Sequence, residues 1–300
     1  MSVTALLGAV SQGLLWGVMA LGVYITYRIL NYADLTAEGS FTLGAAVAAR
    51  LIVGESFDPL ISTLLAMCAG MMAGAITGFL HTVLKVPPLL SGILTMTGLY
   101  SINLRVMGMA NIPLMRGTET LMSRMASFLG TNERIASIVI GGIFILAVIG
   151  ILRLFFNTEL GYALRATGDN EAMVKAQGVN TNRMKILGLV MANACVALSG
   201  ALAFQSLGFA DIGMGIGVIV IGLASVIIGE VIFRDKHSHR SLIAVVLGSV
   251  TYRVIIALVL AIGIHPNDFR LISAIMLALA LSMPLIRERM TKCLQLKISK

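Results

Sequence analysis

Apolar segments long enough to cross a lipid bilayer take up most of this 300-residue chain. A transmembrane helix needs about 20 consecutive, predominantly apolar residues. Segments of roughly that length lie at residues 5–28, 38–54, 59–84, 88–108, 134–156, 184–207, 213–233, 241–263 and 270–286. They predict an all-α, polytopic transmembrane bundle of about nine passes, with eight to ten as the range. We expect residues 1–300 to form a single transmembrane domain.

The composition excludes the main classes of soluble protein. Charged residues make up only 12% of the chain and apolar residues 58%, whereas a typical soluble domain is about 25% charged. The net charge of +8 could suggest a nucleic-acid partner, but no dense basic stretch is interleaved with aromatic residues. A secreted enzyme, a disordered scaffold and a nucleic-acid-binding protein are therefore excluded.

The basic residues also predict how the chain is oriented. Clusters at residues 234–240 and 287–300 each follow an apolar segment, and loops rich in Lys and Arg stay on the cytoplasmic side. This bias places the N-terminus outside and the C-terminus in the cytoplasm. The two long connections, residues 109–133 and 157–182, then lie outside and inside, respectively. Because the chain begins without a basic n-region, we expect its first apolar segment to be a membrane span and not a cleaved signal peptide.

Two glycine-interrupted segments resemble each other. Residues 34–39 (DLTAEG) lead into 44–47 (GAAV), and residues 211–213 (DIG) lead into 222–226 (GLASV). The predicted topology places Asp34 on the inner side and Asp211 on the outer side. That is the arrangement of an inverted repeat with discontinuous helices, which would lie beside a transport route. The match is short and rich in small residues, so coincidence explains it equally well.

The long inner connection contains a predicted two-turn helix. Asp169 or Asn170 can cap its N-terminus, and Gly178 can end it. Glu171 suits the positive end of the helix dipole and can pair with Lys175, four residues later. So short a helix is not stable alone, and we expect it to dock against another surface. Either a partner protein or the lipid headgroups could supply that surface.

Three motifs surround this helix: Arg165-Ala166, Gly168-Asp169-Asn170 and Gly178-Val179-Asn180. With them, the connection resembles the coupling helix of permease subunits in bacterial ABC importers. The family is the one that includes branched-chain amino acid and ribose-type permeases. The segments that begin at Asp34 and Asp211 resemble other parts of that family, and the resemblance spans residues 31–286. Near the end, the chain is most similar to a subgroup associated with binding proteins for aromatic amino acids such as tryptophan, through Tyr252-Arg253, Asp268, Leu271-Ile272 and Ala274.

The resemblance implies a division of labour among several chains. The complex would contain a cytoplasmic ABC ATPase dimer, an extracytoplasmic substrate-binding protein and a second permease, either a copy or a paralogue, at the bacterial plasma membrane. ATP and Mg²⁺ would bind to the ATPase, so we expect no cofactor in this chain and no enzymatic activity of its own. Accordingly, no Lys is followed by Ser or Thr, as a Walker A loop requires. The coupling helix would include Arg165, Asp169, Asn170, Glu171, Lys175 and Gly178.

Several polar residues near or within the predicted spans are candidates for the translocation path. They are Asp34, Thr97, Ser101, Asn103 and Arg253. Thr97, Ser101 and Arg105 share one face of a helix, where they could line a pore or bond to neighbouring helices. An ionisable residue such as Arg253 is costly at membrane depth. It could guide a substrate carboxylate, pair with Glu230 or extend to the interface.

The remaining motifs indicate packing more than chemistry. Gly70, Gly74 and Gly78 form two overlapping GxxxG motifs, which predict close helix contact within or between subunits. The histidines and cysteines lack metal-ligand spacing, so we expect no metal site. The outer connection carries four charges that a docked binding protein or water would satisfy equally well: Arg116, Glu119, Arg124 and Glu133.

The sequence therefore predicts the permease subunit of an ATP-driven, binding-protein-dependent importer. It would move a small solute, with an aromatic or another amino acid as the first candidate, into the cytoplasm by alternating access. The alternative is an ion-coupled secondary transporter of a small polar solute, for which Glu38 and Glu230 are the candidate carboxylates. A membrane-embedded enzyme or a channel subunit would need a catalytic cluster or a ring-forming polar stripe.

Overall fold

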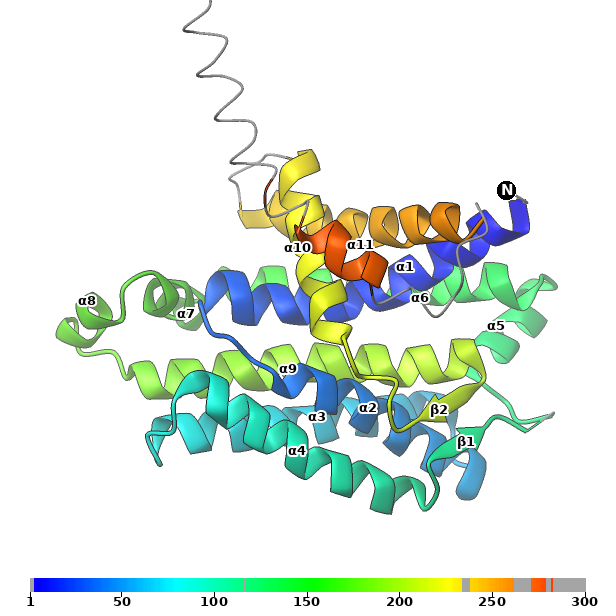
Figure 1. Cartoon of the computed structure of the whole chain (residues 1–300), viewed down its shortest axis with the longest axis horizontal. Coiled ribbons are helices and arrows are strands. Elements are labelled where there is room, and N and C mark those ends of the chain that lie inside the picture. Colours follow the sequence, from blue (N-terminus) through cyan, green and yellow to red (C-terminus); the bar gives the residue numbers. More distant parts are fainter. Residues whose placement is uncertain (1–2, 116, 234–237, 262–270, 279–281, 283–300) are drawn as a thin grey trace, which may run out of the picture.

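Long helices, packed side by side, build the molecule (Figure 1). The computed structural model describes all residues except 1–2, 116, 234–237, 262–270, 279–281 and 283–300. The described elements are α1 (Val3–Tyr24), η1 (Ile25–Ile29), α2 (Thr36–Ala49), η2 (Arg50–Gly54), α3 (Pro59–Thr82), α4 (Pro88–Met107), β1 (Asn111–Pro113), α5 (Leu121–Leu129), α6 (Glu133–Phe156), α7 (Glu159–Asp169), α8 (Glu171–Ala176), α9 (Thr181–Leu207), β2 (Phe209–Asp211), α10 (Val218–Phe233) and α11 (Ser238–Ala261). Residues 271–278 are also helical. The predicted all-α polytopic bundle is confirmed.

Six helical stretches are long and apolar enough to cross a membrane, within the residues that the structure describes. They are Thr4–Ile29, Thr36–Gly54, Pro59–Thr82, Glu133–Phe156, Thr181–Leu207 and Ser241–Ala261. Of the other predicted spans, α4 has 20 residues and α10 has 16. Part of the predicted span 270–286 lies outside the described residues. The expected number of passes therefore stays a prediction.

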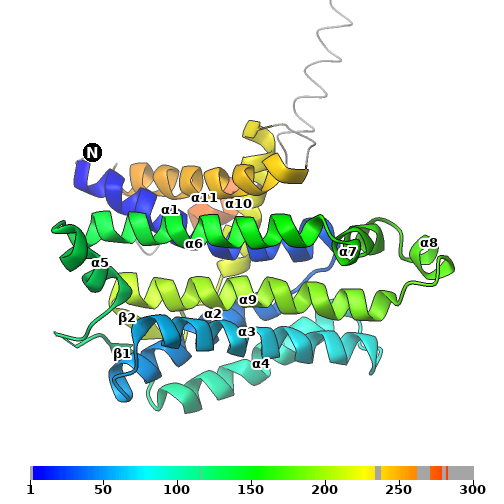
Figure 2. The same cartoon turned by 180° about the vertical axis from the view of Figure 1, so that it is seen from behind.

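The helix α9 is the centre of the bundle. It contacts α1, α2 and α3 and runs between the layer of α1 and α6 and the layer of α2 and α3, as Figure 2 shows. Glycines let α3 approach closely, because a Cβ atom at Gly70 or Gly74 would clash with backbone carbonyls of α9, and one at Gly78 would lie 2.9 Å from Ile186 Cγ1. The three glycines of the predicted GxxxG motifs thus pack within one chain.

Two connections enter the bundle as non-helical chain. Beyond α1 and the π-helical turn η1, residues 31–34 are non-helical, and α2 begins only at Thr36. In Figure 1 this connection runs diagonally from the end of α1 to the start of α2 beside α9. Likewise, residues 208–217 separate α9 from α10. These are the segments that the sequence predicts to be interrupted; their relation as an inverted repeat stays a prediction.

The position predicted for Asp34 is wrong. The sequence places this residue on the inner side, but its carboxylate contacts Asn193, near the middle of α9. The error has a physical cause, because the topology rule assigns polar segments to the loops outside the bilayer. A polar segment that returns into the bundle cannot be distinguished from such a loop by its charge.

The two long connections lie at opposite ends of the bundle. At one end, α7 and α8 project beyond the other helices (Figures 1 and 2). At the other end lie α5, the first residues of α1 and an antiparallel strand pair, in which Asn111 faces Asp211 and Pro113 faces Phe209. The opposition of the two connections agrees with the predicted topology. Which end faces the cytoplasm stays a prediction.

Candidate functional site

The projecting end is organised by short helices with side-chain caps. The Thr158 hydroxyl accepts a hydrogen bond from Gly161 N at the start of α7. The Asn170 carboxamide accepts one from Met173 N at the start of α8. Between the two candidates from the sequence, Asn170 is thus the cap, whereas Asp169 is the last residue of α7. Gly178, with φ +84°, follows the end of α8 in the left-handed conformation.

Glu171 joins α8 to the first turns of α9. Its carboxylate lies 2.8 Å from Lys175 Nζ, as the sequence predicts, and also 2.8 Å from Lys185 Nζ. The Thr181 hydroxyl donates a third contact at 3.1 Å. Hydrogen bonds from Lys175 and Lys185 lower the pKa of Glu171 from 4.5 to about 2. At neutral pH, Glu171 is therefore ionised and fixes the orientation of α8 relative to α9.

The surface of α8 is small and mixed in character. Val174 is buried, whereas Ala172, Met173 and Ala176 are exposed. Arg165, predicted to belong to this coupling site, instead supports α7: its guanidinium bonds to Phe156 O and lies 4.8 Å from the ring of Tyr162. The exposed part of α8 thus offers a shallow apolar face on a rigidly held turn, which suits a protein contact.

A buried polar cluster surrounds the start of α2. Asp34 Oδ1 accepts a hydrogen bond from Thr36 N at 2.9 Å, and Oδ2 accepts one from Asn193 Nδ2 at 2.8 Å. Ser40 Oγ donates to Asn193 Oδ1 at 2.7 Å. All four residues are at most 3% exposed. The interruption before α2 is therefore held by side chains in place of helical hydrogen bonds.

The candidate residues on α4 lie on two different faces. Asn103 is buried and donates to Gly39 O at 3.2 Å, which places it beside the start of α2. Thr97 and Ser101 are exposed on the outward face, together with Arg105, and the Thr97 hydroxyl bonds to its own helix at Ile93 O. The structure thus brings Asn103 and Asp34 to the same helix, α2, but Thr97 and Ser101 lie elsewhere.

Arg253 lies apart from the α2 cluster, between α11 and α1. Its guanidinium carbon is 3.9 Å from the centroid of the Trp16 ring, and Nη1 donates to Gln12 Oε1 at 3.2 Å. The predicted partner Glu230 pairs instead with Arg28, at 2.9 Å. The pairing of Arg253 with Glu230 is therefore wrong, since hydropathy gives the helices but not the direction in which each polar side chain points.

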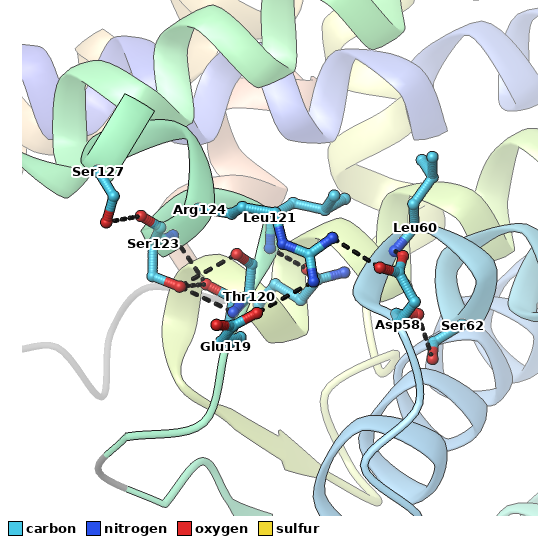
Figure 3. Close-up of polar contacts among 10 residues, drawn as sticks. Asp58, Leu60, Ser62, Glu119, Thr120, Leu121, Ser123, Arg124 and Ser127 are labelled. Carbon is cyan, nitrogen blue, oxygen red and sulfur yellow. Dashed lines mark hydrogen bonds and ion pairs between the residues drawn. The ribbon is translucent and has the colours of Figure 1, made fainter. Parts of the chain in front are cut away.

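At the end opposite α8, Arg124 connects two segments, as Figure 3 shows. Its guanidinium is 2.6 Å from Asp58 at the start of α3 and 3.0 Å from Glu119 before α5. The hydrogen bond from Arg124 lowers the pKa of Asp58. A cavity of about 540 Å³ lies beside these charges. Two of the charges predicted to meet a binding protein or water, Glu119 and Arg124, thus contact each other and hold the connection against α3.

A family model described as "Branched-chain amino acid transport system / permease component" matches residues 5–281. The chain belongs to this permease family. A tyrosine transport system permease protein of Clostridioides difficile (strain R20291) is 41% identical over 274 residues, which cover 91% of this chain and 89% of the relative. The autoinducer 2 import system permease protein LsrC of Yersinia pseudotuberculosis (serotype O:3, strain YPIII) is 27% identical over 195 residues, 64% of this chain and 53% of the relative.

A solved structure shares the fold of the permease. It is PsaBC from Streptococcus pneumoniae in complex with Fab, with a TM-score of 0.50 at 16% sequence identity. The match covers 92% of this chain and 89% of the other. The resemblance drawn from the sequence is thus confirmed at the level of the family, and the chain is a transport permease.

Sequence reasoning missed two parts of the candidate site. It predicted neither α7 nor the role of Asn193, the residue that binds both Asp34 and Ser40. A signal for Asn193 was present, because it is a carboxamide surrounded by small apolar residues within a predicted span. A polar side chain at that position needs partners inside the bundle. The partners themselves depend on tertiary packing.

Proposed function

We propose that this permease is the transmembrane subunit of an ATP-driven importer that takes up an aromatic amino acid, delivered by a binding protein, into the cytoplasm. The observation that carries the proposal is the projecting helix α8, held to α9 by Glu171, in a chain that belongs to a transport permease family. The tyrosine transport permease at 41% identity supports an aromatic solute.

In this proposal α8 is the surface that receives force from a cytoplasmic ATPase dimer. Its exposed residues Ala172, Met173 and Ala176 would enter a groove of the ATPase. The ATPase would bind ATP and Mg²⁺, and this chain would supply a gated path. A displacement of α8 reaches α9 through Glu171 and Lys185, and α9 contacts α1, α2 and α3. Together with a second permease, this arrangement would alternate access between the two sides of the membrane.

The contacts of the candidate carboxylates favour the importer over an ion-coupled secondary transporter. Such a transporter needs an intramembrane carboxylate to bind its ion. Glu230 is paired with Arg28 at 2.9 Å, and Glu38 accepts a hydrogen bond from Gly217 N at 2.9 Å. Both carboxylates thus already have partners that stabilise neighbouring segments.

Purification of the tagged permease from its native host tests the proposal. The native chain should recover an ATPase subunit, and Met173→Glu should lose it, because a charge on the exposed face of α8 opposes an apolar contact. The control is Phe128→Glu, which adds the same charge at an exposed position on α5, at the opposite end, and should retain the ATPase. If the native chain brings down no ATPase under conditions that preserve membrane complexes, the importer proposal is overturned.

The solute is tested separately in proteoliposomes that contain the recovered complex and its binding protein. Uptake of labelled tyrosine should require ATP, and unlabelled phenylalanine or tryptophan should compete better than leucine. ATP-dependent uptake of leucine in preference to all three aromatic amino acids would replace the proposed substrate class and leave the importer in place.

A further inference from the structure

Polar side chains tie α9 to other segments at several levels along its length, including its first turn, its middle and its last turn. Near its first turn, Thr181 and Lys185 bond to Glu171, the first residue of α8. Near its middle, Asn193 bonds to the segment before α2. Near its last turn, the Gln205 carboxamide accepts a hydrogen bond from Leu121 N of α5 and donates one to Thr63 of α3. The central helix is thus linked to both ends of the bundle and to its interrupted interior.

The contacts near the middle of α9 differ from the others, because they hold the non-helical segment before α2. Asn193 is fully buried, and both atoms of its carboxamide are used: Nδ2 donates to Asp34 Oδ2 and to Leu189 O, and Oδ1 accepts from Ser40 Oγ. Asp34 lies just before α2 and Ser40 lies in its second turn. One side chain of α9 is therefore hydrogen-bonded both to the non-helical segment and to the helix that follows it.

The helix α9 connects these Asn193 contacts to α8. The helix is continuous over 27 residues, from its Asn180 cap to the left-handed Gly208. An α-helix without a kink moves as one body, because its backbone hydrogen bonds resist bending. A shift of its first turns, where Lys185 holds Glu171, therefore displaces Asn193 as well. Because the segment before α2 lacks helical hydrogen bonds, it is the part of the interior that can follow such a displacement.

We propose that Asn193 is a positioning residue for transport, which transmits displacement of α8 through α9 to the interrupted segment before α2. The inference rests on the proposed function, since it needs an ATPase that moves α8. It does not require Asn193 to touch the solute. Packing of α9 depends on other contacts, including the close approach of α3 at Gly70 and Gly74, so loss of the carboxamide should affect coupling more than assembly.

The experiment uses the whole complex, with ATPase and binding protein, in proteoliposomes. It measures ATP hydrolysis and solute uptake together and reports the uptake per ATP. The variants are Asn193→Leu, which keeps the branching at Cγ but removes all three bonds, Asp34→Asn, Asn193→Asp, and the exchange Asp34→Asn/Asn193→Asp. In the exchange, the carboxamide placed at position 34 can still donate to the carboxylate placed at position 193, and Ser40 can still donate to the other oxygen of that carboxylate. The bond to Leu189 O is given up, and an oxygen of the carboxylate at position 193 then faces that carbonyl oxygen.

The matched control is Ser199→Ala. Ser199 is also fully buried on α9, and its hydroxyl donates to Leu15 O of α1 at 2.8 Å. It therefore tests the loss of a buried hydrogen bond on the same helix without a change at the segment before α2.

We expect Asn193→Leu to lower the uptake per ATP by about fivefold or more, the lower range of measured coupling effects, while ATP hydrolysis is retained. Ser199→Ala should leave the ratio unchanged. The exchange should restore most of the ratio that its two single variants lose. This rescue also decides the case in which Asn193→Leu yields no intact complex.

Two outcomes overturn the inference. In one, Asn193→Leu and Ser199→Ala lower uptake and hydrolysis in parallel, which is the signature of a purely structural role. In the other, the exchange is no better than its worse single variant. The proposed function fails in a different way, because the unmodified complex would then show no ATP-dependent uptake, and the inference would fall with it.

Discussion

The turns at Asp34 and Asp211 have the same local geometry but different surroundings. In both, the aspartate Oδ1 accepts a hydrogen bond from the backbone N–H two residues later, at 2.9 Å from Thr36 and 2.8 Å from Gly213. The second oxygen distinguishes them. In Asp34 it binds Asn193 in the interior of the bundle, whereas in Asp211 it binds the exposed side chain of Asn111, at 3.3 Å.

The difference separates what the local sequence determines from what tertiary packing determines. An aspartate favours this turn wherever it occurs, because its side chain bonds to the backbone two residues later. The local sequence does not decide whether the turn lies in the interior or at one end. That depends on tertiary packing, which also supplies the partner of the second carboxylate oxygen. The segments that follow the two turns also meet, since Glu38 in α2 accepts a hydrogen bond from Gly217 N at 2.9 Å. A change in one can therefore reach the other.

The largest difference between the turns should appear when each aspartate is removed. Asp34→Ala takes away two buried hydrogen bonds and leaves polar atoms without partners, at about 1–3 kcal/mol for each buried group. Asp211→Ala removes bonds that water can replace, and should cost less than about 1 kcal/mol. The thermal midpoint of the detergent-solubilised permease measures both. Equal decreases in the thermal midpoint for the two variants would contradict the difference in burial between the two turns.

A smaller effect is expected where the segments after the two turns touch. A Cβ atom at Gly215 would clash with the backbone carbonyl of Glu38, whereas one at Gly213 would lie 3.2 Å from Asp211 Oδ1, within its own turn. Gly215→Ala should therefore destabilise the permease by about 1–3 kcal/mol, as overpacking does, and Gly213→Ala by less. Thermal midpoints compare the pair, and a larger loss for Gly213→Ala would contradict the contact between these segments.

The smallest effect concerns Glu171 and depends on pH. Because its pKa is lowered to about 2 in the folded permease, its ion pairs stabilise the protein fully above its ordinary pKa of 4.5. That contribution decreases as the pH falls from 4.5 through 2. Glu171 is partly exposed, so the effect should stay below about 1 kcal/mol. The thermal midpoints of the native permease and Glu171→Gln should therefore differ at pH 7, approach each other below pH 4.5 and converge only at about pH 2.

The same variant sharpens the comparison of the turns. If α9 carries the effect of Glu171 inward, Glu171→Gln should speed hydrogen exchange at neutral pH in residues 30–36 and leave 211–217 unchanged. Faster exchange only in 211–217 would show that the Asp34 turn is not the one connected to α8.

Hydropathy predicted the helices well because membrane spans must be long and apolar. The predicted 59–84, for example, corresponds to α3 at Pro59–Thr82. The cap at Asn170 and the pairing of Glu171 with Lys175 were also predictable, since both follow from spacing along one helix. The helix α7 was missed because it is a short amphipathic element within a polar connection, where no membrane requirement marks its ends.

Contacts between distant segments could not be derived in the same way. Lys185 contacts Glu171 together with Lys175, but its reach depends on how α8 folds back onto α9. The pairing of Arg28 with Glu230 depends on the rotation of α1 and α10 about their axes. Neither the rotation of a helix nor the folding back of α8 onto α9 leaves a periodic signal, because most of these helices are apolar on nearly every face.

The helix α2 lies between two π-helical turns, η1 before the interrupted segment and η2 at its own end. A π turn contains one residue more than the α turn it replaces. Loss of one residue within 25–29 or 50–54 would thus convert the turn to α-helix without changing the register of the helix that precedes it, α1 or α2. Single-residue gaps in alignments of related permeases should accordingly fall in these two windows. An insertion within α2 itself would instead rotate part of its buried face away from α9.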